Sequence, residues 1–341
     1  MIAEGMGVLF SEVPDDFGSV FGELVYILTG IPEGTTADAE VFTTRSDVPV
    51  GVKRLLGGEQ VPVDISCYMR RLLAPVPIAE GGAGFAVDEG RCVTAAVKCT
   101  DEMSPVRTFT GAVRELSEYE VLTTLPMRRT IAWEESDEIS LLVPRCVMTW
   151  SWTACGRETY VYESPEYTAA RGIVTLTVGM PALREELVAA GVSPDGVTGL
   201  KVTVRCGGES VAEAQYDLCR RPAGAVRLCW FNEMGALDYH TFGYAVAESV
   251  DASREVFRSR GGYAAASVSL EVRTTLWSGY LPRLWTEGLA RIPASPLVWR
   301  AEEEAFVPVD VLPAVSRFGA GTLHSVELTV RDGAPRPAQN F

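Results

Sequence analysis

The sequence predicts a mainly β protein made of tandem antiparallel β-sandwich-like domains with a few short helices. Short runs rich in Val, Thr, Tyr and Phe recur along the chain, and Gly, Pro, Asp and Ser interrupt them every ~8 to 15 residues. Several runs alternate small or polar residues with branched ones, as in a strand with one buried face. Helical patterns are few and short.

At 341 residues the chain is long enough for two or three domains, each with its own core. We expect an N-terminal β-sandwich over 1–116 and a second sandwich over 117–230. A C-terminal β domain over 231–341 would end in a Pro-rich, irregular tail, since the last residues read RDGAPRPAQNF. Polar residues near 116 and the segment 230–240 mark the two limits.

Two segments have helical signals. The second domain should contain a helix over 181–190, because Pro181 fits a first helical position and Gly191 can end the helix. The C-terminal domain should contain a helix over 281–291, where large apolar residues have helical spacing before Pro293.

Residues 60–100 resemble residues 174–207 in their order of patterns. Each segment reads as a strand, a short amphipathic turn or helix, and an alternating strand. A duplicated β-sandwich would explain this correspondence, and chance similarity is the alternative.

The composition argues against several partners. The chain has 30 Lys and Arg against 45 Asp and Glu, a net charge of -15, which opposes binding to nucleic acid or anionic lipid. No Sec-type leader and no long apolar run is visible, so we expect no membrane insertion and an intracellular protein. The sequence predicts no cofactor.

The cysteines form no C-x-x-C pair and most lie in apolar, strand-like runs. We therefore expect buried free thiols rather than four disulfides. The eight are Cys67, Cys92, Cys99, Cys146, Cys155, Cys206, Cys219 and Cys229.

Signals for chemistry are weak. With only His240 and His324 and no paired cysteines, a zinc or iron site is not expected, and no G-x-S-x-G motif holds a nucleophilic serine. The glycine-rich stretches at 57 and 80 lack a P-loop pattern. The acidic clusters WEESDE (133–138) and AEEEAF (301–306) are expected to face water.

The tryptophans could form an interface or stack on a ligand. On strands such residues more often fill cores or subunit interfaces than form a carbohydrate-binding surface. The candidates are Trp150, Trp152, Trp277, Trp285 and Trp299.

Residues 227–246, RLCWFNEMGALDYHTFGYAV, hold the densest set of polar and aromatic residues. The pattern predicts a β-hairpin whose turn, NEMG, uses Gly235 at positive φ. Asp238 and His240 could act as an acid–base couple, but such a pair is more often on the outer face of a hairpin. Asn232 and Asp238 are expected to stabilise the turn by hydrogen bonds.

This segment resembles the pattern W-L-N-R-x-G-G-x-D-x-x-T-F in tail-module proteins of phages and prophages of Bacteroidetes-type bacteria. The stretches VDISCYMRRLL, LWTEGLARIPASPLVW, FVPVDV and GTLHSVELTVRDGAPRP agree with the layout of that family. The chain departs from the pattern at Glu233 and Ala236. The matching residues are Trp230, Phe231, Asn232, Gly235, Asp238, Thr241 and Phe242.

The resemblance implies a structural tail or baseplate component with no catalytic residues, assembled in the host bacterial cytoplasm and located in the virion tail. Its partners would be itself, as a ring or trimer, and other tail proteins, with a host-surface glycan as a further candidate. The main alternative is a carbohydrate-binding or adhesin-like β-sandwich protein. A third class is a hydrolase that uses Asp238, His240 or the acidic clusters.

Overall fold

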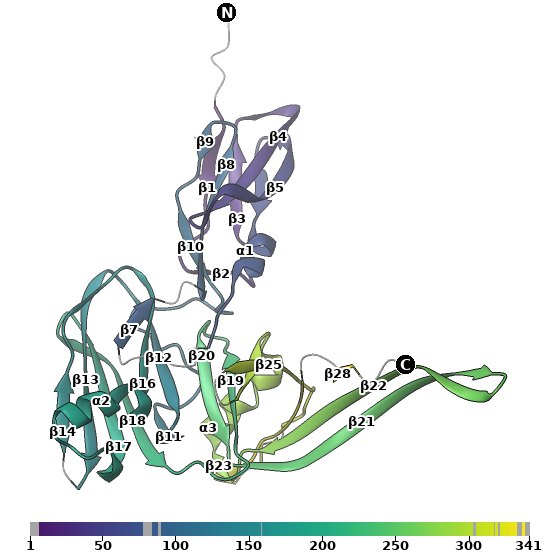
Figure 1. The fold of residues 1–341 in the computed structure, drawn as a ribbon. Coiled ribbons are helices and arrows are strands. Elements are labelled where there is room, and N and C mark those ends of the chain that lie inside the picture. Colours follow the sequence, from purple (N-terminus) through teal and green to yellow (C-terminus); the bar gives the residue numbers. More distant parts are fainter. Residues whose placement is uncertain are drawn as a thin grey trace, which may run out of the picture.

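The computed structural model describes residues 7–77, 84–87, 90–157, 159–302, 305–316, 318–319, 321–332 and 336–337. Strands dominate, and they form several antiparallel or mixed sheets with three short helices, so the chain is a mainly β protein as the sequence predicts (Figure 1). No helix in these residues has the length and apolarity that a membrane crossing requires.

The first unit packs two sheets around a core that includes Tyr26, Leu28 and Phe109. Its three-stranded sheet has the order β1-β3-β6, and its larger sheet has the order β2-β10-β8-β4-β5, with β9 on β8. The elements are β1 (Leu9–Glu12), β2 (Gly18–Ser19), β3 (Val25–Thr29), β4 (Ile31–Thr43), β5 (Ser46–Gly58), β6 (Val61–Asp64), α1 (Ser66–Leu72), β8 (Cys92–Cys99), β9 (Glu102–Met103) and β10 (Arg107–Thr110).

The second unit is also a pair of sheets, packed around Trp150, Trp152 and Tyr216. One sheet has the order β11-β18-β17-β13-β14, with β15 on β13, and the other has the order β12-β16-β7. The elements are β7 (Gly84–Val87), β11 (Arg128–Ala132), β12 (Ser136–Val143), β13 (Cys146–Gly156), β14 (Tyr160–Glu163), β15 (Tyr167–Ala169), β16 (Gly172–Gly179), α2 (Met180–Ala189), the 3-10 helix η1 (Pro194–Gly196), β17 (Val197–Cys206) and β18 (Glu209–Cys219).

The larger sheets of the two units have the same topology, whereas in the smaller sheets the third strand joins a different side, β1 beside β3 and β7 beside β16. The order β2-β10-β8-β4-β5 matches β11-β18-β17-β13-β14 strand for strand, and in both sheets the first pair is parallel while the others are antiparallel. In both units a helix follows a strand of the smaller sheet and leads to the central strand of the larger one. The similar segments 60–100 and 174–207 occupy these equivalent positions, so the topology supports an internal duplication.

The third unit has one long sheet with the order β20-β19-β24-β25-β27-β22-β21, in which β28 also pairs with β22, and a small sheet of β23 and β26. Its core includes Trp230, Phe242 and Leu289. The elements are β19 (Val226–Phe231), β20 (Leu237–Phe242), β21 (Tyr244–Ser259), β22 (Gly262–Trp277), β23 (Leu281–Pro282), α3 (Arg283–Leu289), the 3-10 helix η2 (Ile292–Ala294), β24 (Val298–Ala301), β25 (Phe306–Val311), β26 (Leu323–His324), β27 (Glu327–Asp332) and β28 (Arg336–Pro337).

β21 and β22 form a long hairpin, here called the arm, that projects away from the rest of the molecule (Figure 1). Figure 1 also shows the three units meeting around β19, β20 and β12. We call this region the junction, and it holds the hairpin of β19 and β20, β12 and the chain from 111 to 125.

The helices lie close to their expected positions. α2 carries Pro181 in its first turn and buries Leu183 and Leu187 in the second unit. α3 lies within the expected 281–291, and Leu289 enters the core of the third unit.

Of the two expected domain limits, one lies in a connection between strands and the other lies inside a strand. Position 116 lies between β10 and β11, whereas position 230 lies inside β19. In addition, β7 comes from the first third of the chain but pairs with β16 of the second unit. Most residues of the Pro-rich tail lie outside the described residues; of those described, Arg331 and Asp332 end β27 and Arg336–Pro337 form β28.

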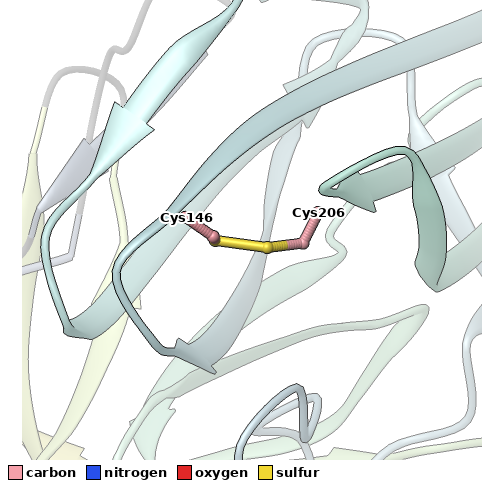
Figure 2. Close-up of a disulfide and its surroundings, with 2 residues drawn as sticks. All are labelled: Cys146 and Cys206. Atoms are coloured by element: carbon pink, nitrogen blue, oxygen red, sulfur yellow. A yellow bond between two sulfur atoms is a disulfide. The ribbon is translucent and has the colours of Figure 1, made fainter.

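The expectation of free thiols is wrong for two of the eight cysteines. Cys146 and Cys206 form a disulfide, with Cα atoms 6.3 Å apart (Figure 2). The antiparallel pairing of β13 with β17 brings these residues together across 60 positions of sequence. The other six cysteines, all among the described residues, take part in no disulfide bond, and of these only Cys99 and Cys229 are fully buried.

Candidate functional site at the junction of the three units

The segment 227–246 contains the antiparallel hairpin of β19 and β20, in which Trp230 pairs with Asp238 and Leu228 with His240. Gly235 in the turn has φ +77°, a conformation that favours glycine. A Cβ atom there would lie 2.7 Å from the backbone nitrogen of Ala112, which belongs to the chain leaving the first unit. The turn therefore needs glycine for its conformation and for this close contact.

Asn232 and Asp238 organise the hairpin and the chain that crosses it. The Oδ1 atom of Asn232 accepts hydrogen bonds from the backbone N–H groups of Met234 and Ala236 at 2.9 and 3.2 Å. Its Nδ2 atom donates to Asp238 at 2.8 Å and to the carbonyl oxygen of Leu122 at 3.2 Å. These contacts stabilise the turn and also connect it to the segment before the second unit.

Asp238 does not lie on an outer face of the hairpin, contrary to expectation, because the segment 122–125 covers that face. The carboxylate is fully buried and accepts hydrogen bonds from the backbone N–H and hydroxyl of Thr124, at 2.8 and 2.7 Å, and from the hydroxyl of Thr123. Arg129 lies 3.6 Å from it. The carboxylate thus connects the third unit to the start of the second.

The acidic cluster 133–138 is also buried rather than solvated. Glu135, Asp137 and Glu138 have at most 5% of their surface exposed, whereas Glu134 is exposed. Packing of the hairpin and of the first unit against β12 removes these carboxylates from water, and arginines from elsewhere in the chain neutralise them.

Glu138 contacts one residue from each of the other two units. Arg91, which precedes β8 of the first unit, forms a buried ion pair with it, and the Tyr239 hydroxyl from β20 donates a hydrogen bond to it. Arg91 also donates to Ser140 and Thr175 at 2.6 and 2.9 Å. Burial raises the pKa of Glu138, and Arg91 opposes this shift.

Two further arginines complete the network. Arg129 pairs with Asp137 at 2.8 Å, and burial opposes its charge while Asp137 and neighbouring groups raise its pKa overall. Arg227 of β19 pairs with Glu135 at 3.1 Å and donates to Thr241 at 3.0 Å. Each buried carboxylate of the cluster therefore has a cationic partner.

The ring of His240 lies among aromatic side chains, while the carboxylate of Asp238 is hydrogen-bonded to Thr123, Thr124 and Asn232. The His240 ring contacts Phe242 and Trp285, with ring centroids 4.9 and 5.5 Å away. Its Nε2 atom is buried with no hydrogen-bond partner among the residues that the structure describes. Burial lowers the pKa of His240 to about 3, with further lowering by Arg227 and Arg129.

An apolar pocket of about 360 Å³ lies beside the hairpin, at the meeting point of the first and third units. The buried Trp230 and Phe231 line it together with the exposed Val113 and Pro296. Glu233 and Arg291 also line the pocket and form an ion pair. An apolar or aromatic side chain is the kind of group that this lining favours.

The expected tryptophan sites differ in burial. Trp150 and Trp152 fill the core of the second unit, stacked near Tyr160 and Tyr162, and cannot present a surface to a sugar. Trp299 is buried in a small cluster with Tyr239. The partly exposed candidates are Trp277 and Trp285.

The remaining candidates from the sequence are a metal site, the second acidic cluster and the two glycine-rich stretches. No group of His, Cys, Asp and Glu suited to a metal occurs in the described part of the chain. In the second acidic cluster, Glu302 pairs with Arg300 at 2.8 Å, while 303 and 304 lie outside the described residues. The glycine-rich stretch at 57 is the end of β5 and its turn, and residues 80–83 of the other stretch also lie outside the described residues.

Sequence reasoning missed the three buried arginines, Arg91, Arg129 and Arg227. Each lies in a strand-like run, and its partner is between 8 and 92 positions away. An arginine in an otherwise apolar strand is the one signal that could have indicated a buried partner.

No protein-family model matches the chain, and no curated protein is similar to it. Among solved structures, a crystal structure of a protein of unknown function from Porphyromonas gingivalis W83 is 11% identical. The match covers 62% of this chain and 98% of that chain, with a TM-score of 0.14. A likeness this weak carries no argument about fold or function.

Proposed function

We propose that this chain is a non-enzymatic structural component of a phage or phage-like tail or baseplate. It would act by self-association and by docking to other tail proteins, and its place would be the virion tail. The resemblance of residues 227–246 and of the flanking segments to tail-module proteins supports this proposal.

The observation that carries the self-association is the exposed arm. β21 is the last strand of its sheet, and all its residues from 244 to 258 are exposed. An open strand edge of this length with apolar side chains is a site where another protein chain can pair or pack. The exposed apolar residues are Tyr244, Val246, Val250, Val256, Phe257 and Tyr263.

The burial at the junction supports a role without catalysis. Asp238, Glu138 and the other carboxylates of the cluster are paired with groups of the same chain, and His240 is held neutral in an aromatic environment. Groups in this state position strands and units instead of meeting a substrate.

The test is to purify phage or phage-like particles by density gradient from lysates of the bacterium that encodes the chain. Mass spectrometry of the particles should find this chain in a fixed ratio to other tail proteins. Recovery of intact tails that lack the chain would contradict the proposal.

A cluster of exposed aromatic residues favours a second candidate, a carbohydrate-binding protein. Trp277 lies against Tyr244 and Tyr280, with ring centroids 6.3 and 5.6 Å away, and both tyrosines are largely exposed. Aromatic faces of this kind can stack on sugars. Binding on a glycan array that disappears in Trp277→Ala but persists in Trp285→Ala would support this candidate, and no binding by the wild-type chain would reject it.

A further inference from the structure

Two surfaces of this chain are complementary in charge and in apolar character. One surface combines the apolar pocket of the junction with a neighbouring acidic groove of about 740 Å³, and both are lined by Val113. The acidic side chains of the groove are Asp15, Asp16, Glu23 and Glu115.

The groove keeps a negative character despite its ion pairs. Asp16 lies 3.0 Å from Arg171, and Arg114, which also lines the groove, is paired with Glu120. The side chains of Asp15, Glu23 and Glu115 are exposed. The groove therefore attracts a cationic group, and the pocket beside it accepts an apolar one.

The second surface is the tip of the arm. Tyr263 is 76% exposed and lies directly across the strand pair from Arg258, so the two side chains share a face. Arg254 and Arg260 are exposed nearby, and Glu255 is the one acidic residue between 254 and 263. In a chain of net charge -15, this tip is locally cationic.

We propose that the arm tip of one copy binds the junction of a second copy, with Tyr263 in the apolar pocket and Arg258 and Arg260 against the acidic groove. This inference rests on the self-association in the proposed function and adds its interface. A tyrosine in a pocket with arginines at its edge is a composition that concentrates binding energy in protein interfaces.

The arm points away from the junction of its own chain (Figure 1), so its tip can meet the complementary surface of this chain only on a second copy. The contact joins two different surfaces, so each copy keeps one free tip and one free pocket for the next. Repetition of such a contact gives a ring if it closes and a filament if it does not.

The experiment measures the mass in solution of full-length variants by light scattering across a concentration series. A tip variant carries Tyr263→Ala and Arg258→Glu, and a pocket variant carries Val113→Arg at the edge that the pocket and groove share. All three positions are exposed, so the variants should fold, which circular dichroism checks. Arg184→Glu, on the exposed side of α2, is the control that changes the charge in the same direction as the tip variant.

We expect the wild type and Arg184→Glu to associate, and each of the two variants to associate at least ~10-fold more weakly, in line with the loss of an interface anchor. A mixture of the tip variant and the pocket variant should form a one-to-one complex, because one intact tip can still bind one intact pocket. This rescue would not occur if two arms paired with each other.

Association of both variants at the wild-type level overturns the inference while leaving the proposed function standing. A mixture that stays monomeric also overturns it. A wild-type chain that stays monomeric at every concentration overturns both the interface and the self-association in the proposed function.

Discussion

Glu138 is the residue at which the three units meet. Its carboxylate lies on β12 of the second unit and holds Arg91 of the first and Tyr239 of the third. All three side chains are buried, so removal of any one leaves its partners without compensation in a dry environment. A buried carboxylate in this position determines how the units pack.

The lowered pKa of His240 should make the folded chain less stable at acidic pH. This pKa is about 3 in the folded chain, below the ordinary 6.5, so below pH 6.5 the unfolded chain binds a proton that the folded chain does not. Stability should fall as the pH falls from 6.5 towards 3, by up to about 1.4 kcal/mol per pH unit from this group.

Denaturant unfolding of the wild type and of His240→Phe at several pH values checks this. The difference in free energy of unfolding between the two proteins reports the contribution of His240. This difference should be constant above pH 6.5, and below pH 6.5 it should shift in favour of the variant. A difference that does not change between pH 7 and pH 4 would show that the ring can accept a proton in the folded chain.

The close approach of Gly235 to Ala112 can be tested by substitution, with a second glycine of the same backbone conformation as the control. Gly235 and Gly224 have nearly equal φ values of +77° and +76°, but only at Gly235 does an added Cβ meet backbone, at Ala112. Gly224→Ala should cost about 1 kcal/mol from backbone strain alone, and Gly235→Ala at least about 2 kcal/mol. Urea unfolding measures both, and equal costs would mean that the turn does not press on the first unit.

At the scale of elements, the hairpin of β19 and β20 could be predicted because its signals are local. Alternation set the two faces, and Asn232 and Gly235 fit a tight turn. The burial of Asp238 could not be predicted, since the residues that cover it, Thr123 and Thr124, are more than a hundred positions away. A sequence pattern does not show which face of a hairpin another unit covers.

The disulfide was missed for the same reason. Cys146 and Cys206 become neighbours only through the register of β13 and β17, which no local pattern specifies. The acidic cluster 133–138 has the composition of a solvated turn, and only the packing of Arg91 and Arg227 against it makes burial possible.

The disulfide should stabilise the second unit. Replacing both Cys146 and Cys206 with serine should lower the free energy of unfolding by about 2–4 kcal/mol, since the bond closes a long loop of the unfolded chain. Cys155→Ser, at an exposed free thiol, is the matched control and should change it by less than about 0.5 kcal/mol. Denaturant titrations compare them, and equal effects would indicate that the bond does not form in solution.

For the whole molecule, the mainly β fold class could be predicted from the sequence, whereas the way in which the three units pack together could not. Strand-like runs and short helices predicted a mainly β chain. No sequence pattern indicated that residues of the first third of the chain pack in the second unit. There, β7 pairs with β16, and Arg91 donates hydrogen bonds to Ser140 and Thr175. The second unit is therefore incomplete without residues of the first.

The central claim is that the junction is architecture that couples the three units, and calorimetry tests it most directly. The wild type should unfold in one cooperative transition, because buried ion pairs and strand pairing connect the units. Glu138→Ala should lose about 3–5 kcal/mol and split the transition, since Arg91 and Tyr239 lose their shared partner. Glu134→Ala, in the same cluster but exposed, should unfold like the wild type. Unfolding of Glu138→Ala at the wild-type temperature and in a single transition would contradict the claim.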